Sequence, residues 1–381
     1  MSASRTFTRP HPLVRAASML RTSASRLAPR DVPFLLARLA VLAAGRASLP
    51  LDAIFQAGYK DVPVERPVFI LGHPRSGTTF LHRLITQTEE FPAFQTWELL
   101  VPSLTARKLL GPLVPGLVRL LGKGFHDASA VFAEDAHEVR IDSIEEEELL
   151  FLFSMDSQFL LLFTALGFVE QDPWDLVYPD RQPKADRDAS MALFRGCLQR
   201  QIHATGRTRV VAKMPYSTLR VRTLLEHFPD ARIVYLVRSP LETIPSHLSL
   251  HHHLFTQLYG PGNVPAELME RYWDRRYRFN VELYRYFRDV EEARVIPDDQ
   301  LLVVRYPELQ EDLGGVFERC MAFAGIEPSS ALQAAVGAQA ARQSSYRRGH
   351  TNQRVEEFGI SQERVMADLG WVYDAYRLPR P

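Results

Sequence analysis

The chain has 381 residues, of which 46% are hydrophobic, so it can bury one large core or two modest ones. Its formal net charge is zero, which excludes the global field typical of proteins that bind nucleic acid or acidic partners. Its two distant cysteines, Cys197 and Cys320, form neither a disulfide framework nor a zinc spacing, so we expect buried free thiols in a cytoplasmic protein.

Residues 1–65 carry no motif that we can use and are expected to form a helical appendage or a basic arm. The first 30 residues contain six arginines, and no acidic residue precedes Asp31. This composition is typical of a mitochondrial-type presequence or of a basic, partly disordered arm that touches phospholipid or the protein's own surface, and we prefer the arm. A spanning helix needs roughly 18 uninterrupted apolar residues, but Arg38 interrupts the candidate at 33–44. We therefore expect peripheral contact with a membrane at most.

The segment 66–85 is the most informative part of the chain. Its apolar run Val68–Leu71 predicts a buried parallel strand. Gly72 and Pro74 then predict a loop, and an amphipathic helix opens at Gly77. When a strand, a loop and a helix N-terminus follow in this order, unpaired backbone N–H groups and the positive end of the helix dipole point at one place. The segment therefore predicts an anion-binding site.

This loop differs from a nucleotide P-loop at one position. Gly72 and Gly77 have the spacing of a P-loop, but Thr78 stands where an NTPase needs lysine. Arg75 lies inside the loop instead. We expect a bound phosphate or sulfate, and a P-loop kinase or NTPase stays open as an alternative.

Later segments alternate between strands and helices, which predicts a single parallel α/β domain over residues 66–381. Two stretches depart from this alternation: an acidic helix at Asp142–Phe153 and a polar loop at Tyr178–Asp188. We interpret Glu145–Glu148 as an exposed helix face, with recognition of an amine-bearing acceptor as the alternative. The expected later strands and helices are Thr208–Lys213, Ser217–Phe228, Arg232–Val237, Pro240–Leu250, Pro265–Ala293, Leu301–Arg305 with a helix through Ala324, and a helical tail at Val355–Tyr376.

Polar side chains follow the three later strands. Lys213 ends the second strand, Arg238 follows the third with Ser246 two helical turns on, and Tyr306 follows the fourth. Open parallel sheets bind ligands beyond the carboxyl ends of their strands. We expect Arg238 and Ser246 to bind a second anion some distance from the first. With a lysine and an aromatic ring at the same edge, the set fits a nucleotide with phosphates at both ends.

Four histidines follow Ser246 closely. His247 and His251 have the i, i+4 spacing of metal ligands, but no third type of ligand accompanies them. We expect contact with the nucleotide or the acceptor instead of a metal.

The four motifs together resemble the sulfotransferases that use 3′-phosphoadenosine 5′-phosphosulfate (PAPS). The sequences HPRSGTTFL, KMPYSTLRVRTLLEHFPDARIVYLVRSPLETIPSHLSL and VVRYPELQEDL follow the order of that family, and EEFGISQERV is similar to its bacterial branch. Protein tyrosine sulfotransferases share the layout more distantly. The resemblance covers residue 66 to the C-terminus and implies the sulfotransferase fold, a P-loop-like parallel β-sheet flanked by helices.

The resemblance also implies the reaction. A sulfuryl group would pass from PAPS to a hydroxyl, or to an amine, of a small molecule, lipid or glycan. Because a sulfuryl group carries less charge than a phosphoryl group, no metal is required. A non-catalytic nucleotide-binding protein on the same fold is the second alternative. The leucine- and proline-rich stretch Pro92–Phe132 and the loop after Tyr178 are candidates for the acceptor site, and their composition suggests a hydrophobic alcohol.

Individual roles follow from the resemblance, position by position. The 5′-phosphosulfate would be bound by Arg75, Ser76, Gly77, Thr78 and Thr79. The 3′-phosphate would be bound by Arg238 and Ser246, and Tyr306 would lie beside the adenine. Lys213 matches the lysine that contacts the bridging oxygen.

The base has three candidates. Glu98 lies 23 residues after Arg75, close to the catalytic glutamate of tyrosine sulfotransferases once two residues are inserted. Other branches of the family use a histidine, which keeps His126 and His137 as alternatives.

Overall fold

The computed structural model describes residues 6–27, 31–88, 90–116, 142–343 and 353–380. The chain is divided into two compact units. The sheet unit comprises Val64–Ala93, Arg207–Ser249 and Arg276–Pro381. The helical unit comprises Met1–Pro63, Phe94–Gly206 and Leu250–Arg275. The expected domain boundary at residue 65 lies close to Val64, where the chain leaves the helical unit and enters the sheet unit. The expected single domain 66–381 contributes residues to both units.

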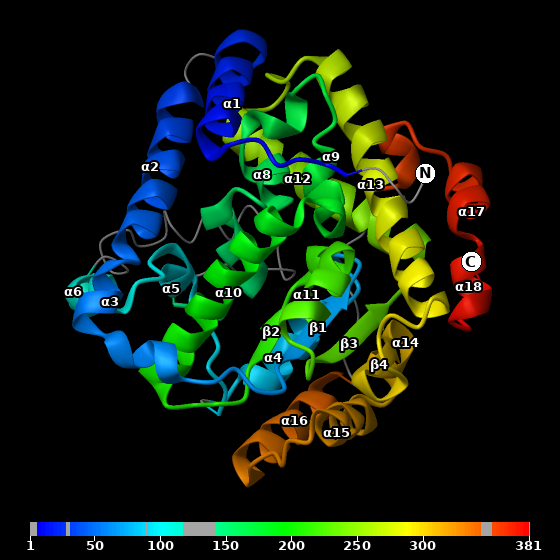
Figure 1. Cartoon of the computed structure of the whole chain (residues 1–381). Coiled ribbons are helices and arrows are strands. Elements are labelled where there is room, and N and C mark those ends of the chain that lie inside the picture. Colours follow the sequence, from blue (N-terminus) through cyan, green and yellow to red (C-terminus); the bar gives the residue numbers. More distant parts are fainter. Residues whose placement is uncertain (1–5, 28–30, 89, 117–141, 344–352, 381) are drawn as a thin grey trace. The chain divides into compact units, whose positions relative to one another are not determined.

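The sheet unit is built on four parallel strands in the order β2-β1-β3-β4 (Figure 1). Their bounds are β1 Val68–Gly72, β2 Val211–Lys213, β3 Arg232–Val237 and β4 Leu301–Arg305. Every residue of β1 is buried, as its uninterrupted apolar sequence predicts for a central parallel strand. The predicted parallel α/β sheet is therefore confirmed.

Helices of the sheet unit cover this sheet and form its core with it. Apolar side chains of β1, β3 and β4 pack with those of α4, α14, α15 and α16 in one cluster that includes Ile70, Leu84, Phe317 and Leu332. The helices are α4 Thr78–Thr86, η7 Pro215–Arg220, α11 Val221–His227, η8 Asp298–Gln300, α14 Tyr306–Glu311, α15 Leu313–Ala324, α16 Ser330–Gln343, η9 Val355–Phe358, α17 Gln362–Leu369 and α18 Trp371–Ala375. Two longer helices, α12 Pro240–Tyr259 and α13 Ala266–Glu292, contribute residues to both units.

In its described residues the helical unit contains helices and one isolated bridge, Gln95 to Ile144. Its longest helix, α10, extends over Lys184–Thr205. The others are α1 Pro12–Arg26, α2 Val32–Ser48, α3 Leu51–Phe55, η2 Ala57–Asp61, α5 Thr96–Leu100, α6 Leu104–Leu110, η3 Gly111–Leu113, η4 Glu147–Ser154, α8 Phe159–Phe163, η5 Ala165–Phe168, α9 Trp174–Val177 and η6 Pro179–Arg181.

The predicted polar loop at Tyr178–Asp188 is wrong in most of its length. Tyr178 is buried, and its ring stacks with those of Phe7 and Trp174. Pro179 opens η6, and Pro183 is the N-cap of α10. The prolines that suggested a loop start helices here, because proline is tolerated at a helix N-terminus.

The predicted exposed acidic face is also wrong. Glu145, Glu147 and Glu148 are buried, and the expected helix is limited to the 3-10 helix η4. Leu150 and Phe151, which follow the glutamates, are fully buried, so the segment enters the protein interior with its carboxylates.

Two further expectations concern the thiols and the membrane. Cys197 and Cys320 are free and buried, as predicted, and burial raises the pKa of their thiols to about 11 and about 12. Among the residues described, one helical segment, Val32–Phe55, is long and apolar enough to cross a membrane by length and composition. Arg38 therefore interrupts the apolar character of this segment less than we expected.

Candidate functional site

The predicted anion-binding residues of the sheet unit meet at one edge of the sheet. Because all four strands are parallel, their carboxyl ends lie on the same side. This brings together Gly72 at the end of β1, Lys213 at the end of β2, Arg238 after β3 and Tyr306 after β4. We call residues 73–77, between β1 and α4, the anion loop.

Two glycines give the anion loop its path. Gly72 has φ of 139°, and a Cβ at this position would lie 2.3 Å from the carbonyl oxygen of Leu236. Gly77 has φ of 99°, and a Cβ there would lie 3.1 Å from the ring of Tyr306. Both positions combine a left-handed backbone with a close neighbour, which only glycine accommodates without strain.

Arg75 connects the anion loop to the segment after β3. Its φ of 73° is unusual for a residue other than glycine, and such strain often marks functional loops. Its Nε donates a hydrogen bond to Ser246 Oγ at 3.0 Å, and its carbonyl oxygen accepts one from Arg238 Nη1 at 3.2 Å. We expected Ser246 and Arg238 to lie some distance from the first anion site. At these three residues the two predicted sites are instead in direct contact.

The start of α4 has the features of an anion site. Gly77 is its N-cap and, having no side chain, makes no capping hydrogen bond to the first N–H groups of the helix. Ser76 is fully buried, and within the described chain its Oγ has no hydrogen-bond partner. A buried hydroxyl without a partner is costly, and an anion bound in the loop would satisfy it.

Lys213 reaches the same helix from the neighbouring strand. Its side chain is buried, and its Nζ donates a hydrogen bond to Thr79 Oγ1 at 2.9 Å. His82, one turn further along α4, has its pKa lowered to about 3 by burial and, secondarily, by the charge of Lys213. His82 is therefore neutral, and Lys213 supplies a buried cation beside the N-terminus of α4.

Arg238 is oriented by two neighbours. Its guanidinium carbon lies 3.8 Å from the ring centroid of Tyr306, and its Nη2 lies 3.0 Å from Glu242 Oε1. The ring and the carboxylate limit the rotation of a planar group that otherwise has many rotamers. The ring of Tyr306 thus contacts Arg238 and approaches Gly77, and its expected place beside an adenine stays a prediction.

Sequence reasoning missed a buried polar cluster in the sheet unit. The hydroxyl of Tyr216 lies 2.9 Å from His247 Nε2, and His247 Nδ1 lies 2.7 Å from Asn280 Oδ1. His73, the first residue of the anion loop, lies edge-on to His247, and burial lowers its pKa to about 3. Both ring nitrogens of His247 therefore face protein groups, so its expected contact with nucleotide or acceptor has no support here.

This cluster has only a weak signal in the sequence. Tyr216 lies three residues after Lys213 and His247 directly after Ser246, so both flank residues that the motifs identify. Nothing near Asn280 indicates that it belongs with them.

The remaining histidines do not form a metal site in the described chain. His251 bonds to the hydroxyl of Tyr272 within the helical unit. No group of three or more histidines, cysteines or acidic residues that could bind a metal is found among the residues described. The expectation that the reaction requires no metal stays a prediction.

Glu98 lies in the helical unit, where its side chain caps the helix α5. It forms a capping box at the start of α5, with its Oε2 accepting the backbone N–H of Gln95 at 2.8 Å. The same oxygen accepts Nε2 of Gln201 at 3.1 Å, and Nη1 of Arg107 lies 3.5 Å from Oε1. The side chain is 18% exposed.

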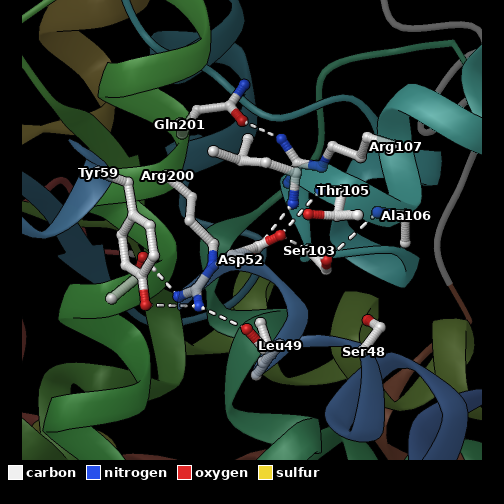
Figure 2. A network of polar contacts seen from close by, with 12 residues as sticks. Ser48, Leu49, Asp52, Tyr59, Ser103, Thr105, Ala106, Arg107, Arg200 and Gln201 are labelled. Carbon is white, nitrogen blue, oxygen red and sulfur yellow. Dashed lines mark hydrogen bonds and ion pairs between the residues drawn. The ribbon is translucent and has the colours of Figure 1, made fainter. Parts of the chain in front are cut away.

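A buried network adjoins this carboxylate (Figure 2). Arg107 bonds to Gln201 and, through Nη2, to the carbonyl oxygen of Glu98 at 2.9 Å. Asp52, in α3, accepts hydrogen bonds from Ser103 Oγ and from Arg200 Nε, at 2.8 and 2.6 Å. Residues 49–59 thus share one polar network with α5, α6 and α10.

The network keeps Asp52 ionised. Burial alone would raise the pKa of this carboxyl group, but hydrogen bonds from Thr105, Arg200 and Ser103 outweigh burial and hold the pKa below its usual range. A buried ion pair satisfied in this way is costly to break.

The alternative bases His126 and His137 lie outside the described residues, as does the end of the expected acceptor stretch Pro92–Phe132. Within that stretch, α5, α6 and η3 are described. The structure thus gives geometry for Glu98 alone among the three candidate bases.

Comparison with known proteins adds independent findings. A sequence model of the sulfotransferase family matches residues 67–330. The omega-hydroxy-beta-dihydromenaquinone-9 sulfotransferase Stf3 of Mycobacterium tuberculosis is 27% identical over 271 residues, which cover 70% of this chain. The chain spans 64% of the length of that relative and of its counterpart in Mycobacterium bovis.

Solved structures agree in fold. Sulfotransferase STF9 from Mycobacterium avium superposes with a TM-score of 0.74 at 18% identity, covering 100% of this chain and 99% of its own. Sulfotransferase STF1 from Mycobacterium tuberculosis has a TM-score of 0.68 at 19% identity, with 94% and 92% covered. At these identities the likeness establishes a shared fold.

Proposed function

Because the chain belongs to the sulfotransferase family, we propose that it transfers a sulfuryl group from PAPS to a hydroxyl of an apolar acceptor, an amine being the less favoured alternative. The observation that carries the proposal is the contact of Lys213 with Thr79. A lysine from the adjacent strand reaches the N-terminus of α4, where an NTPase would use a lysine of its own loop. Donor, acceptor and residue roles are all parts of this proposal.

The 5′ end of PAPS would bind in the anion loop. The uncapped start of α4 offers backbone N–H groups, and Ser76 offers a buried hydroxyl. Arg75 and Thr78 would complete the set, the first by its charge and the second by its position at the first turn of the helix.

Lys213 would stabilise the negative charge that develops on the bridging oxygen when its bond to the sulfuryl group breaks. PAPS supplies an activated sulfuryl group, and its transfer, like phosphoryl transfer, relies mainly on positioning and on charge stabilisation. A buried ammonium group stabilises developing negative charge far more strongly than a solvated one. Thr79 would aim the ammonium group by the hydrogen bond that it accepts.

The 3′-phosphate would bind Arg238 and Ser246. Arg238 is oriented by Tyr306 and Glu242 before any ligand binds, which reduces the entropy lost on binding. A guanidinium can bind phosphate with two parallel hydrogen bonds. Tyr306 would contribute its remaining ring surface to the adenine.

Glu98 would accept the proton of the acceptor hydroxyl. Its capping-box bond and Arg107 fix the carboxylate in one orientation, as a general base requires. The same contacts also suit a residue that only caps α5. That observation favours the second candidate, a non-catalytic nucleotide-binding protein, and the experiments must separate the two.

The acceptor class rests on apolar composition. The stretch Pro92–Phe132 is rich in leucine and proline. The named activity of Stf3 concerns a hydroxylated menaquinone derivative, which is a lipid. We propose a small apolar molecule or lipid as the acceptor and, because both cysteines are free thiols, a reducing cytoplasmic location.

Thermal unfolding in the presence of nucleotides tests the donor site. We expect 3′,5′-diphosphoadenosine to raise the unfolding temperature without magnesium, and ATP and AMP to raise it less. Stabilisation by Mg-ATP alone would instead support a P-loop NTPase. Stabilisation by diphosphoadenosine without any transfer of label from PAPS to a lipid extract would support the non-catalytic alternative.

A further inference from the structure

The helical unit carries an unusual number of exposed apolar side chains. Throughout the described part of the chain, every large hydrophobic side chain that is strongly exposed lies between Leu13 and Leu113. Ile54 and Leu109 are the extreme cases within α3 and α6, at 73% and 71% exposed, and Phe34 in α2 is 66% exposed. Single exposed hydrophobics are ordinary, but a concentration in a few helices marks an interaction surface.

Two of these helices, α3 and α6, are joined by hydrogen bonds. Ser103 and the backbone N–H of Thr105, at the start of α6, bond to Asp52 in α3, and Lys108 donates to Gln56 at 2.9 Å. Figure 1 shows α3 and α6 side by side, next to the end of α2. We define the apolar face by Phe34, Val41, Ile54, Phe55, Leu109 and Leu113.

The charges of this face have one sign. Within α2, α3 and α6 the only acid is Asp52, which is buried, and the exposed Asp61 lies beyond α3 at the end of η2. Arg46 and Lys108 are exposed within the same helices. An apolar surface with cations and no exposed carboxylate is complementary to an anionic bilayer. A two-fold contact between two copies would bring like charges together, because each copy presents the same patch.

One side of α2 contacts protein at three positions, residues 35, 38 and 45. Leu35 is buried, and Arg38 Nη1 donates to the carbonyl oxygen of Phe163 at 3.0 Å. Gly45 is so close to Phe153 that a Cβ would lie 2.5 Å from that ring. A helix with one side packed on protein and the other apolar side exposed suits the membrane interface better than a bilayer crossing.

We propose that the apolar face docks this protein on the surface of an anionic lipid bilayer, with α2, α3 and α6 lying in the interfacial plane. Apolar side chains enter the acyl boundary, while Arg46 and Lys108 contact lipid headgroups. The proposal stands independently of the proposed reaction. If the acceptor is a lipid, docking gives the protein access to the phase in which such an acceptor dissolves.

Vesicle co-sedimentation of the full chain tests this proposal. We expect binding to vesicles of phosphatidylcholine with phosphatidylglycerol, and weaker binding to phosphatidylcholine alone. The triple variant Phe34→Glu, Ile54→Glu, Leu109→Glu should reduce the partition coefficient about tenfold or more, because three apolar side chains lose their burial. The matched control is Ala331→Glu, Ala334→Glu, Ala338→Glu, three exposed positions of α16, which should bind like the wild type.

Three results would overturn the proposal. The first is a wild-type chain that does not sediment with either vesicle, a measurement that requires no variant to fold. The second is a wild-type dimer in analytical ultracentrifugation that the triple variant splits, which would make the apolar face a contact between copies. The third is resistance to alkaline carbonate extraction, which would mean that Val32–Phe55 crosses the membrane.

Discussion

At the scale of single residues, the groups expected to bind PAPS are held by one another. Arg75 bonds to Ser246, Arg238 bonds to the backbone of Arg75, and Lys213 bonds to Thr79. These contacts fix the side chains of three cationic residues at one edge of the sheet, where an anion could bind. The same contacts explain why charged side chains are tolerated in a largely buried place.

Replacement of Arg238 tests the 3′-phosphate role. Arg238→Ala should weaken binding of 3′,5′-diphosphoadenosine about tenfold to a hundredfold, since a charge-assisted hydrogen bond contributes roughly 1.5–3 kcal/mol. Binding of AMP, which lacks the 3′-phosphate, should change little. Isothermal titration measures both. Arg285→Ala is the control, because Arg285 is an arginine of the sheet unit that pairs with Asp368 away from the anion loop. An equal loss for both nucleotides would contradict the assignment.

Replacement of Glu98 distinguishes a role as the general base from a role as a helix cap. Glutamine preserves the capping box but cannot accept a proton at this position, so Glu98→Gln should keep the unfolding temperature and lose about 10²-fold or more of the turnover. Glu98→Ala should also lose about 1 kcal/mol of stability with the cap. Turnover of Glu98→Gln equal to that of the wild type would move the base elsewhere, with His126 and His137 as the next candidates.

At the scale of elements, the turn from β1 into α4 determines the geometry of the anion loop. Its left-handed glycine allows the ring of Tyr306 to approach the loop backbone. Tyr306 in turn stacks with Arg238, so the glycine affects groups from two other strands.

Replacement of Gly77 tests this coupling. Gly77→Ala should destabilise the protein by about 1–2 kcal/mol and weaken diphosphoadenosine binding, because alanine disfavours φ of 99° and its Cβ crowds Tyr306. Gly337→Ala is the matched control, since a Cβ there, within α16, would meet nothing within 4 Å and alanine favours a helix. Urea unfolding measures both variants. Equal stability and nucleotide affinity of Gly77→Ala and the wild type would refute this account of the loop.

The sequence predicted some elements well because their signals are local. The strands β1 and β3 contain uninterrupted apolar runs, and the three later strands end at the predicted residues Lys213, Val237 and Arg305. The helix α10 was missed because Pro179 and Pro183, which precede it, indicated a loop and because its apolar periodicity is interrupted by polar residues that become buried. The Tyr216, His247 and Asn280 cluster was missed because its members are brought together only by tertiary packing.

At the scale of the whole molecule, residues 1–63 are part of a larger compact unit. They belong with Phe94–Gly206 and Leu250–Arg275, and Asp52 shares a buried network with residues 103–107 and Arg200 (Figure 2). The expectation of an appendage arose because the segment has no motif, but its buried contacts could not be read from a chain pattern. The function of this segment in our account is to fold α5 and α6 and to present the apolar face.

The stability of the protein should fall in mild acid. His73 and His82 are buried, and their pKa values of about 3 lie below the value of about 6.5 expected in the unfolded chain. The unfolded state therefore binds more protons below pH 6.5, and the free energy of unfolding falls as the pH falls. Between pH 7.5 and pH 5.5 we expect a loss of about 2–3 kcal/mol from the two groups together.

Urea unfolding at both pH values measures this loss. His82→Gln should show about half the loss, because one of the two titrating groups is gone. The same pH dependence in this variant and in the wild type would mean that other groups determine the acid sensitivity.

The most direct test of the central claim measures the transfer of labelled sulfate from PAPS to a lipid extract, by the wild type and by Lys213→Ala. We predict that the variant loses about 10²-fold or more of the transfer while its affinity for diphosphoadenosine stays nearly unchanged, because the ammonium group acts on the leaving oxygen. Lys184→Ala, which removes an exposed lysine paired with Asp188, should transfer like the wild type. Undiminished transfer by Lys213→Ala, or an equal loss of transfer and nucleotide affinity, would contradict the account.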